Sequence, residues 1–386
     1  MKHDIVIIGG SSAGMTAAAL LAEADFAVAL VEPTAGPEPG GALDKRTVAL
    51  TAHSVQLLDR LGFPWEQRRY CDWRQVVVEE ADSPVPLHFR AEDTGRASLG
   101  RLVEIPELNS GLRQIIAAQE IQVYQESARE MREQPAGVQV LLSQGQVLEA
   151  GLVVAADGAE SWVRQQLGIG LTWHDYQQQA IVAVVTCNRP HAHRAWQRFT
   201  HGFPLAFLPM AASGAAQYSL VWSLPTAEAT RLMCLSDADF ITELQKNMAR
   251  ELGQIQQISQ RCSFPLVARH ALSYYAMKAV LVGDSAHTIH PLAGQGLNMG
   301  LADVAVLAEE LLRARQRRLP LAHLSVLQRY QRRRQADNQR MQDGMTALQR
   351  LMGTKAPLLR VLRGQTWSCI ERQPWLKGLI LDMAFY

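Results

Sequence analysis

Short apolar runs alternate with alanine- and leucine-rich segments at the start of the chain. Ile5 to Ile8 is entirely β-branched and apolar, which is typical of a parallel strand buried on both faces. A glycine- and serine-rich turn follows, then a helical segment from about Met15 to Glu23 and a second apolar strand, Phe26 to Val31. This order of strand, turn, helix and strand predicts a parallel α/β sheet.

Two later apolar runs resemble further strands of the same buried sheet. Leu152 to Ala156 ends at Asp157-Gly158, and Ala279 to Val282 ends at Gly283-Asp284. Each therefore places a carboxylate where a strand stops, a position suited either to a turn or helix cap or to binding the hydroxyls of a ligand. Helical periodicity follows after Ala302 and again from about Leu324.

The middle of the chain has a different, alternating pattern. Alternating strands are predicted at Ala180 to Cys187, Leu205 to Met210 and Tyr218 to Ser223, and Gln75 to Phe89 reads as proline-bearing edge strands. They predict an antiparallel sheet that covers a pocket. We assign residues 1–72, 98–170 and 270–335 to a discontinuous first domain, 73–97 and 171–269 to an inserted second domain, and 336–386 to a C-terminal helical segment.

Composition describes a mildly apolar globular chain. Of 386 residues, 48% are hydrophobic and 19% are charged, and the net charge of +1 gives no reason to expect nucleic acid. The five cysteines show no paired spacing for a metal site or redox exchange, so we expect a reduced, cytoplasmic environment and no bound metal. The first strand is interrupted by Gly9-Gly10, so no signal-peptide core is expected, nor is any run apolar enough to cross a bilayer.

The first turn fits a dinucleotide-binding fingerprint in its proper context. Gly9, Ser11, Ala13 and Gly14 lie between strand and helix, and Glu32 follows about twenty residues later at the end of the next strand. A pyrophosphate is expected at the helix N-terminus, with Glu32 on a ribose. Because Ser11 replaces the middle glycine, we expect weaker or slightly displaced binding rather than its loss.

A second glycine-bearing stretch runs from Val280 to Asp303. Gly294, Gln295 and Gly296 come just before a long helix, whose free N–H groups and dipole favour an anionic group at Gly294 to Leu297. Asp284 is placed to accept hydrogen bonds from an extended ligand.

These two stretches together resemble a known family. Gly283 to His287, followed by His290 to Gly300, is similar to the second flavin motif of aromatic-ring hydroxylases, most closely those of ubiquinone biosynthesis. The resemblance implies the fold of class A flavin monooxygenases: a Rossmann-like FAD-binding domain, an inserted antiparallel-sheet substrate domain and C-terminal helices. It implies that Asp284 binds the ribityl chain, that Pro291 lies beside the reactive edge of the flavin, and that Arg46 begins a helix that packs on the cofactor. The residues assigned to FAD are Gly9, Ser11, Ala13, Gly14, Glu32, Arg46, Asp157, Asp284, Gly294, Gly296, Leu297 and Asn298, with Pro291, Gly294 and Gln295 around the flavin ring.

The resemblance also implies the reaction. NAD(P)H reduces the flavin and leaves, O2 adds to the flavin, and the resulting hydroperoxide hydroxylates the ring of a polyprenylated phenol. Segments similar to the family's substrate domain assign Phe207, Leu208, Pro209 and Trp222 to the substrate pocket, although such a set can also be core. Two alternatives stay open: hydroxylation of a soluble phenol, and an FAD-loaded scaffold subunit. No base for the phenol is evident, and His287 and His290 are expected to be structural.

Arginine is concentrated toward the C-terminus. Between Arg313 and Arg340 the chain carries nine arginines, and Trp367 and Trp375 follow. One interpretation is a solvated helix surface with ordinary ion pairs. The other is a surface for anionic lipid or an acidic partner, which would bring the protein to the inner face of a membrane or to a biosynthetic complex.

Overall fold

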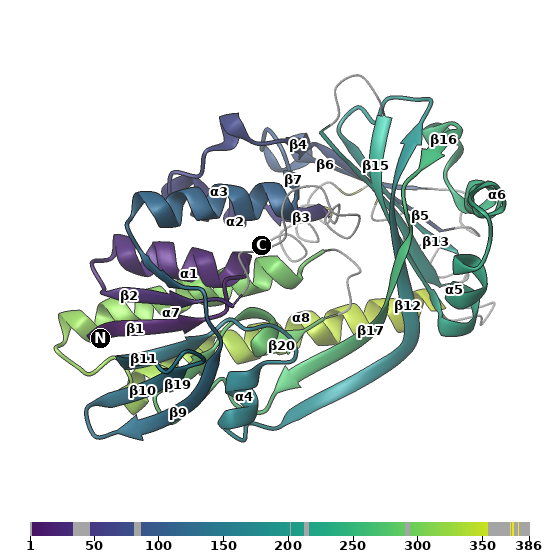
Figure 1. The fold of residues 1–386 in the computed structure, drawn as a ribbon. Helices are drawn as coiled ribbons and strands as arrows, with labels where there is room; N and C mark the ends of the chain where they lie inside the picture. The colour runs from purple at the N-terminus through teal and green to yellow at the C-terminus, as the bar shows by residue number, and fades with distance from the viewer. Residues whose placement is uncertain are drawn as a thin grey trace.

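A parallel sheet forms the core of the first lobe, on the left in Figure 1. Its strand order is β18-β19-β11-β1-β2-β8; β10 pairs antiparallel with β11, and β9 pairs antiparallel with β10. The computed structural model describes residues 2–33, 47–80, 86–200, 202–211, 216–289 and 294–353, with 371, 373 and 377. The strands are β1 (Lys2–Ile8), β2 (Val28–Val31), β8 (Gln122–Tyr124), β9 (Ala128–Gln134), β10 (Gly137–Leu142), β11 (Val147–Ala155), β18 (Tyr275–Ala276) and β19 (Ala279–Leu281).

The predicted apolar strands occupy the centre of this sheet. Ile5, Ile7 and Val154 are fully buried, and β1 pairs in parallel with both β2 and β11. Helix α1 (Ser12–Glu23) packs between α3 (Ile105–Ala118) and α7 (Gly296–Gln316), as Figure 1 shows. The prediction of a parallel α/β sheet is therefore confirmed.

The second lobe is a large, mainly antiparallel sheet with the order β20-β17-β12-β15-β14-β13-β5-β6, and β16 pairs with β12. Helices α5 (Thr226–Met233) and α6 (Asp237–Asn247) cover its outer side (Figure 1). The strands are β5 (Gln75–Glu80), β6 (Leu87–Arg90), β12 (Leu171–Cys187), β13 (Arg194–Thr200), β14 (Phe203–Pro209), β15 (Ala216–Pro225), β16 (Ile255–Ile258), β17 (Cys262–Ala271) and β20 (His287–Thr288).

A small sheet lies beside the first lobe and corrects one sequence prediction. Thr47–Thr51 forms strand β3, which pairs with β7 (Gly100–Glu104), and β7 also pairs with β4 (Tyr70–Trp73). The sequence analysis placed the start of a helix here, but this short segment is rich in β-branched residues and has a partner strand. The helix, α2 (Ala52–Arg60), begins later and is capped by the Thr51 hydroxyl.

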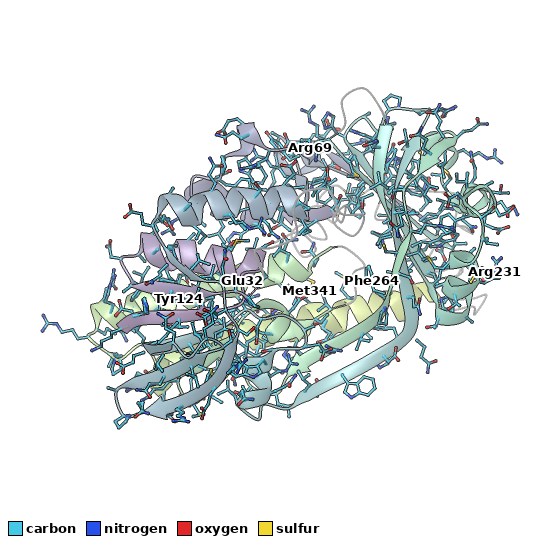
Figure 2. The ribbon with its side chains drawn as sticks, in the orientation of Figure 1. Glu32, Arg69, Tyr124, Arg231, Phe264 and Met341 are labelled. Carbon is cyan, nitrogen blue, oxygen red and sulfur yellow. The ribbon has the colours of Figure 1, made fainter. Side chains whose placement is uncertain are left out.

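The long helix α8 (Leu324–Gly353) connects the two lobes. It packs along α7 at one end and reaches β14 at the other (Figure 1). The expected boundary between residues 335 and 336 falls inside this unbroken helix. Glu32, at the end of β2, and Met341, on α8, both lie in the central part of the molecule between the two sheets (Figure 2).

Short helices complete the described chain. They are η2 (Trp65–Gln67), η3 (Ala91–Thr94), α4 (Trp162–Gln166), η4 (Arg250–Leu252) and η5 (Gly283–Ser285).

Candidate cofactor and substrate site

The glycine-rich turn brings α1 into close contact with the strand ends. Gly9 has a φ of +108°, and a Cβ there would lie 2.3 Å from the carbonyl oxygen of Ala156. A Cβ on Gly14 would lie 1.9 Å from the carbonyl oxygen of Gly9. A side chain at either position would therefore force the turn apart, which explains why these positions require glycine.

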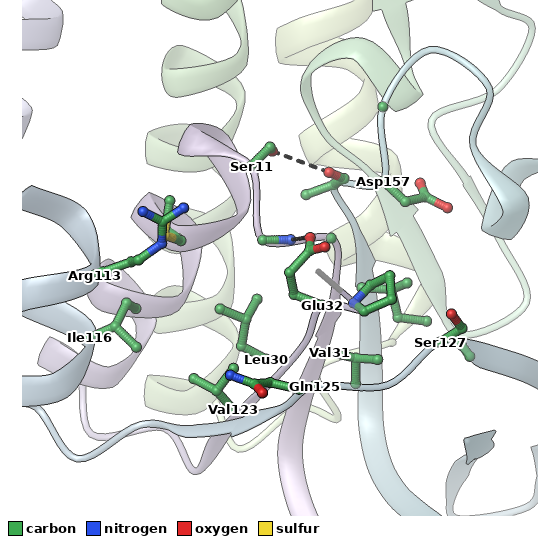
Figure 3. Close-up of a pocket in the computed structure, with 18 of the residues that line it drawn as sticks. Ser11, Leu30, Val31, Glu32, Arg113, Ile116, Val123, Gln125, Ser127 and Asp157 are labelled. Carbon is green, nitrogen blue, oxygen red and sulfur yellow. Dashed lines mark hydrogen bonds between the residues drawn. The ribbon is translucent and has the colours of Figure 1, made fainter. Parts of the chain in front are cut away.

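Ser11 occupies the turn with a structural role of its own. Its hydroxyl accepts a hydrogen bond from the backbone N–H of Gly14, at 3.4 Å, and so caps α1. The same hydroxyl donates to the carbonyl of Ala156 at 3.2 Å, the dashed line in Figure 3. The serine that stands in place of the middle glycine therefore joins the turn to the end of β11 through its hydroxyl.

A cavity of about 990 Å³ opens beside this turn (Figure 3). The Glu32 carboxylate lies at its edge and accepts a hydrogen bond from the backbone N–H of Gly10. The cavity combines an apolar floor with a few polar groups, the usual composition of a small-molecule site. Gly9, Gly10, Ser11, Glu32, Asp157 and Gly158, all from the predicted motifs, line it.

Sequence reasoning missed two polar residues of this cavity. Asn109 and Arg113 are one helical turn apart on α3, and both line it. The Asn109 side-chain oxygen accepts a 2.6 Å hydrogen bond from the Ser12 hydroxyl at the start of α1. In the described part of the chain, Arg113 makes no hydrogen bond or ion pair. The helix is amphipathic, and the i, i+4 spacing of Asn109 and Arg113 along it was the available signal.

The two carboxylate oxygens of Asp157 differ in their partners. One carboxylate oxygen accepts a hydrogen bond from Val163 N at 3.0 Å, which helps to start α4. The other, Oδ1, is buried and has no hydrogen-bond partner among the described residues. A buried carboxylate oxygen without a donor is costly, so this atom is suited to a hydroxyl or N–H group of a ligand in the cavity.

Asp284 is the exposed position in a buried stretch. Its neighbours Val282, Gly283 and Ser285 are buried, and Gly283 has a φ of +61°. A Cβ on Gly300 would lie 3.1 Å from the Gly283 Cα, so α7 approaches this turn very closely. The backbone thus presents the Asp284 carboxylate at the surface of a rigid, tightly packed turn.

A buried polar network lies behind Asp284, and the sequence analysis did not predict it. Asp303 accepts hydrogen bonds from Gly283 N at 3.0 Å, His287 Nε2 at 2.6 Å, Arg334 Nε at 2.7 Å and Asn338 Nδ2 at 3.0 Å. Burial alone would raise the pKa of Asp303, but the charges and hydrogen bonds of His287, Arg334 and Asn338 outweigh burial and lower it to about 2. His287 therefore has a structural partner, as expected.

The start of α7 is attached to β3 by one side chain. The amide of Asn298 donates to the carbonyl of Ala49 at 2.8 Å and accepts from Thr51 N at 3.0 Å and from the Ser54 hydroxyl at 2.8 Å. The Asn298 side chain was expected at the cofactor, but its polar atoms are hydrogen-bonded to β3 and α2 instead.

The N-terminus of α7 is open to a ligand. Gly294 has a φ of +63°, the Gln295 side chain is buried, and a Cβ on Gly296 would meet open space. The helix N-terminus can therefore be approached at Gly296 and Leu297. Arg46, His290 and Pro291 lie outside the described residues.

The four predicted substrate-pocket residues fall on opposite faces of the large sheet. Phe207 and Trp222 are buried in the core against α5 and α6, and Trp222 meets the ring of Phe240 edge-on at 6.1 Å. By strand alternation Pro209 lies on the same face as Phe207. The pocket assignment is corrected for Phe207, Trp222 and Pro209, because they belong to the outer core. Leu208 points the other way and packs, partly buried, with Met345 of α8 against an inner apolar cluster.

Most of the C-terminal arginines pair within the molecule. Glu310, whose side chain is 1% exposed, bonds to Arg329 and Arg333, and Arg313 lies within ion-pair distance. Arg334 is buried on Asp303, so it is not part of a basic surface. Across the described residues, helices long and apolar enough to span a membrane are absent.

Comparison with known proteins places this site in a family. The family described as "FAD binding domain" matches residues 2–345. The 3-demethoxyubiquinol 3-hydroxylase of Escherichia coli is 35% identical, covering 99% of this chain and 98% of its own. Ubiquinone hydroxylase UbiL of Rhodospirillum rubrum is 33% identical, covering 99% of this chain and 89% of its own. In fold the chain resembles p-nitrophenol 4-monooxygenase PnpA of Pseudomonas putida, with a TM-score of 0.81, 18% identity and coverage of 99% and 97%.

These matches span both lobes and agree with the site described above. They confirm the expected class A flavin monooxygenase fold, the FAD cofactor and an aromatic-ring hydroxylase. The chain belongs to the FAD-binding aromatic-ring monooxygenases, in the group of the ubiquinone-biosynthesis flavin hydroxylases.

Proposed function

We propose that this protein hydroxylates the aromatic ring of a polyprenylated phenol, using FAD, NAD(P)H and O2. The observation that carries the proposal is the inner apolar cluster next to the cofactor lobe. Trp73, Val76, Phe89 and Phe199 are buried there, and Leu208 and Met345 pack against them with part of their surface accessible. Such a surface favours an apolar substrate, because each CH2 group that leaves water contributes about 0.8 kcal/mol.

The residues present fit an extended dinucleotide. Gly9 and Gly14 leave room for a close approach, Asp157 Oδ1 lacks a donor among the described residues, and the cavity beside Glu32 has the size of a nucleotide site. We assign the pyrophosphate to the start of α1, a ribose to Glu32 and the ribityl chain to Asp284. Bound FAD would supply the electron transfer and oxygen activation, which side chains alone do not provide.

The protein's own part in the reaction is positioning and the exclusion of water. The N–H groups at the N-terminus of α7 would stabilise the negative charge of a reduced flavin ring bound there. The wall formed by Leu208, Met345 and the inner cluster keeps water from the reacting ring.

The direct test is product analysis with the purified, FAD-loaded protein. A polyprenylated phenol, NAD(P)H and 18O2 should give a product heavier by one labelled oxygen atom. A soluble phenol of the same ring pattern serves as the matched substrate control. Equal turnover of the two would favour the soluble-phenol alternative. No turnover of either, together with loss of quinone synthesis in cells that lack the protein, would favour the scaffold alternative.

We also propose that a basic surface, smaller than the sequence suggested, brings the protein to anionic lipid. Arg317, Arg318 and Arg332 are exposed and have no ion-pair partner in the described ranges. Each contributes about 1 kcal/mol near an anionic surface. Vesicle co-sedimentation across a salt series should show weaker binding after their joint replacement by alanine. Wild-type protein that ignores anionic vesicles at low salt would contradict this.

A further inference from the structure

One face of α8 carries polar side chains that point into the first lobe. Tyr330, Arg334, Asn338 and Gln342 are four residues apart, so they lie in one row along the helix. The Tyr330 hydroxyl donates to the Leu281 carbonyl at 2.6 Å, and Gln342 lies 3.2 Å from His270 Nδ1. One end of the row is therefore fixed to β19, which leads into the cofactor motif, and the other end to β17, which pairs with β20 of that stretch.

The centre of the row meets a single carboxylate, that of Asp303, whose two oxygens have different partners. Oδ1 accepts from Arg334 Nε at 2.7 Å and from Asn338 Nδ2 at 3.0 Å, both on α8. Oδ2 accepts from His287 Nε2 at 2.6 Å and from the backbone N–H of Gly283 at 3.0 Å. Asp303 is fully buried, so these groups determine where its carboxylate sits.

The Gly283 N–H belongs to the Val282–Gly283 peptide, and Gly283 is the residue immediately before Asp284. Its hydrogen bond fixes the turn in which Gly283 has a positive φ and in which α7 comes within contact at Gly300. A small rotation of this turn would change the direction of the Asp284 side chain. The direction of the Asp284 carboxylate thus depends on the orientation of the Asp303 carboxylate, which binds the N–H of the residue immediately before Asp284.

We propose that Arg334 and Asn338 are positioning residues for the cofactor: acting through Asp303, they hold the Gly283 peptide so that the Asp284 carboxylate faces the ribityl hydroxyls. The inference rests on the proposed role of Asp284. It assigns to α8, which is distant in sequence from every flavin motif, a part in cofactor affinity. It also links that affinity to the substrate lobe, because the same helix carries Met345 beside Leu208.

A double-mutant cycle on FAD affinity tests this. Asn338→Ala removes one donor from Asp303 Oδ1 and leaves the Arg334 ion pair in place. Asp284→Ala removes the proposed ligand. FAD dissociation constants of the apoproteins, measured by flavin fluorescence, should rise about tenfold for Asn338→Ala. In the Asp284→Ala background the same Asn338 substitution should change affinity less than about twofold, because the effect passes through Asp284.

The matched control is Gln335→Ala. Gln335 lies on the same helix and donates to the carbonyls of Ala271 and Leu272 at 3.3 and 3.2 Å, without touching Asp303. It should lower thermal stability about as much as Asn338→Ala and leave FAD affinity within about twofold of wild type. The visible spectrum of the bound flavin should shift only in the Asn338 variant, which a general loss of stability would not produce.

The outcomes separate the inference from its premise. Wild-type FAD affinity in Asn338→Ala overturns the inference. So does a double variant whose loss of FAD affinity equals the sum of the losses in the two single variants. If Asp284→Ala itself binds FAD normally, both the role of Asp284 and the inference are overturned.

Discussion

The buried guanidinium of Arg164 donates a 2.9 Å hydrogen bond to the backbone carbonyl of Ser285. It also donates to Ala159 at 2.8 Å, and burial lowers its pKa. One side chain thereby connects the turn after β11 to the turn after β19. Because β11 and β19 are parallel neighbours, with Ala155 opposite Leu281, Asp157 and Asp284 emerge at the same edge of the sheet.

Glu32→Ala should weaken FAD binding by about 1 to 3 kcal/mol, the value of a hydrogen bond to a charged group. The carboxylate lies at the cavity edge, so its loss removes the proposed ribose contact together with the hydrogen bond from the Gly10 N–H. Titration of apoprotein with FAD measures the change. Glu23→Ala, which removes only a surface ion pair with Arg60, is the control. Equal affinities in both variants would remove Glu32 from the site.

Ser11→Gly should retain FAD with wild-type or tighter affinity, and its free energy of unfolding should fall by less than about 1 kcal/mol. Glycine replaces a serine cap at a cost of a few tenths of a kcal/mol, and the bond to Ala156 is lost as well. Gly14→Ala should release the flavin, because its Cβ would collide with the Gly9 carbonyl. Flavin content after gel filtration and urea unfolding report the two effects. Large flavin loss in Ser11→Gly would mean that the hydroxyl contacts the cofactor.

Leu208→Asn should raise KM for the phenol and leave FAD affinity unchanged, because Leu208 faces the inner cluster. Trp222→Ala should instead cost about 3 to 5 kcal/mol of stability, since it empties a core position against α5 and α6. Steady-state kinetics and urea unfolding distinguish these outcomes. A specific KM effect in the Trp222 variant, at a temperature where it remains folded, would return Trp222 to the pocket.

Asp303→Asn should destabilise the protein at neutral pH, and the difference should shrink in acid. The folded pKa of Asp303 is about 2, below the ordinary value of about 3.9. A lowered pKa contributes stability above about pH 4, and this is lost as the pH falls toward 2. The difference in free energy of unfolding between variant and wild type, measured by urea unfolding, should narrow by about 2 kcal/mol over that range. Asp337→Asn, on the exposed side of α8, is the control; an Asp303 gap that stays constant with pH would contradict the assignment.

Patterns within one segment allowed much of this fold to be predicted. Apolar β-branched runs identified β1, β11 and β19, because strands buried on both faces have no polar side chains. The start of α7 followed from glycines before an apolar-periodic segment. The Thr47–Thr51 strand was mistaken for helix because its partner, β7, lies about fifty residues away and leaves no local signal.

The missed site residues share a different cause. Asp303 and Arg334 look like ordinary polar positions on helices, and only their packing across α7 and α8 shows that both are buried. Phe207 and Leu208 differ in role because they are adjacent on a strand and face opposite sides of the sheet. The sequence alone does not say which of the two sides faces the cofactor lobe. The exposed arginines likewise cannot be told apart from their neighbours in the sequence. Only the structure shows that the neighbours pair with Glu310 and Asp303, whereas Arg317, Arg318 and Arg332 do not.

The strand order also sets the time at which this protein can mature on the ribosome. β11 lies between β1 and β19, so the nucleotide-binding sheet joins residues near 5, 150 and 280. Most of the chain must leave the exit tunnel before β19 completes the sheet, and α7 and α8 emerge later still. Non-local pairing of this kind folds slowly. FAD capture should therefore come late in synthesis, and until then the hydrogen-bonding edge of β11 that β19 will occupy stays unpaired.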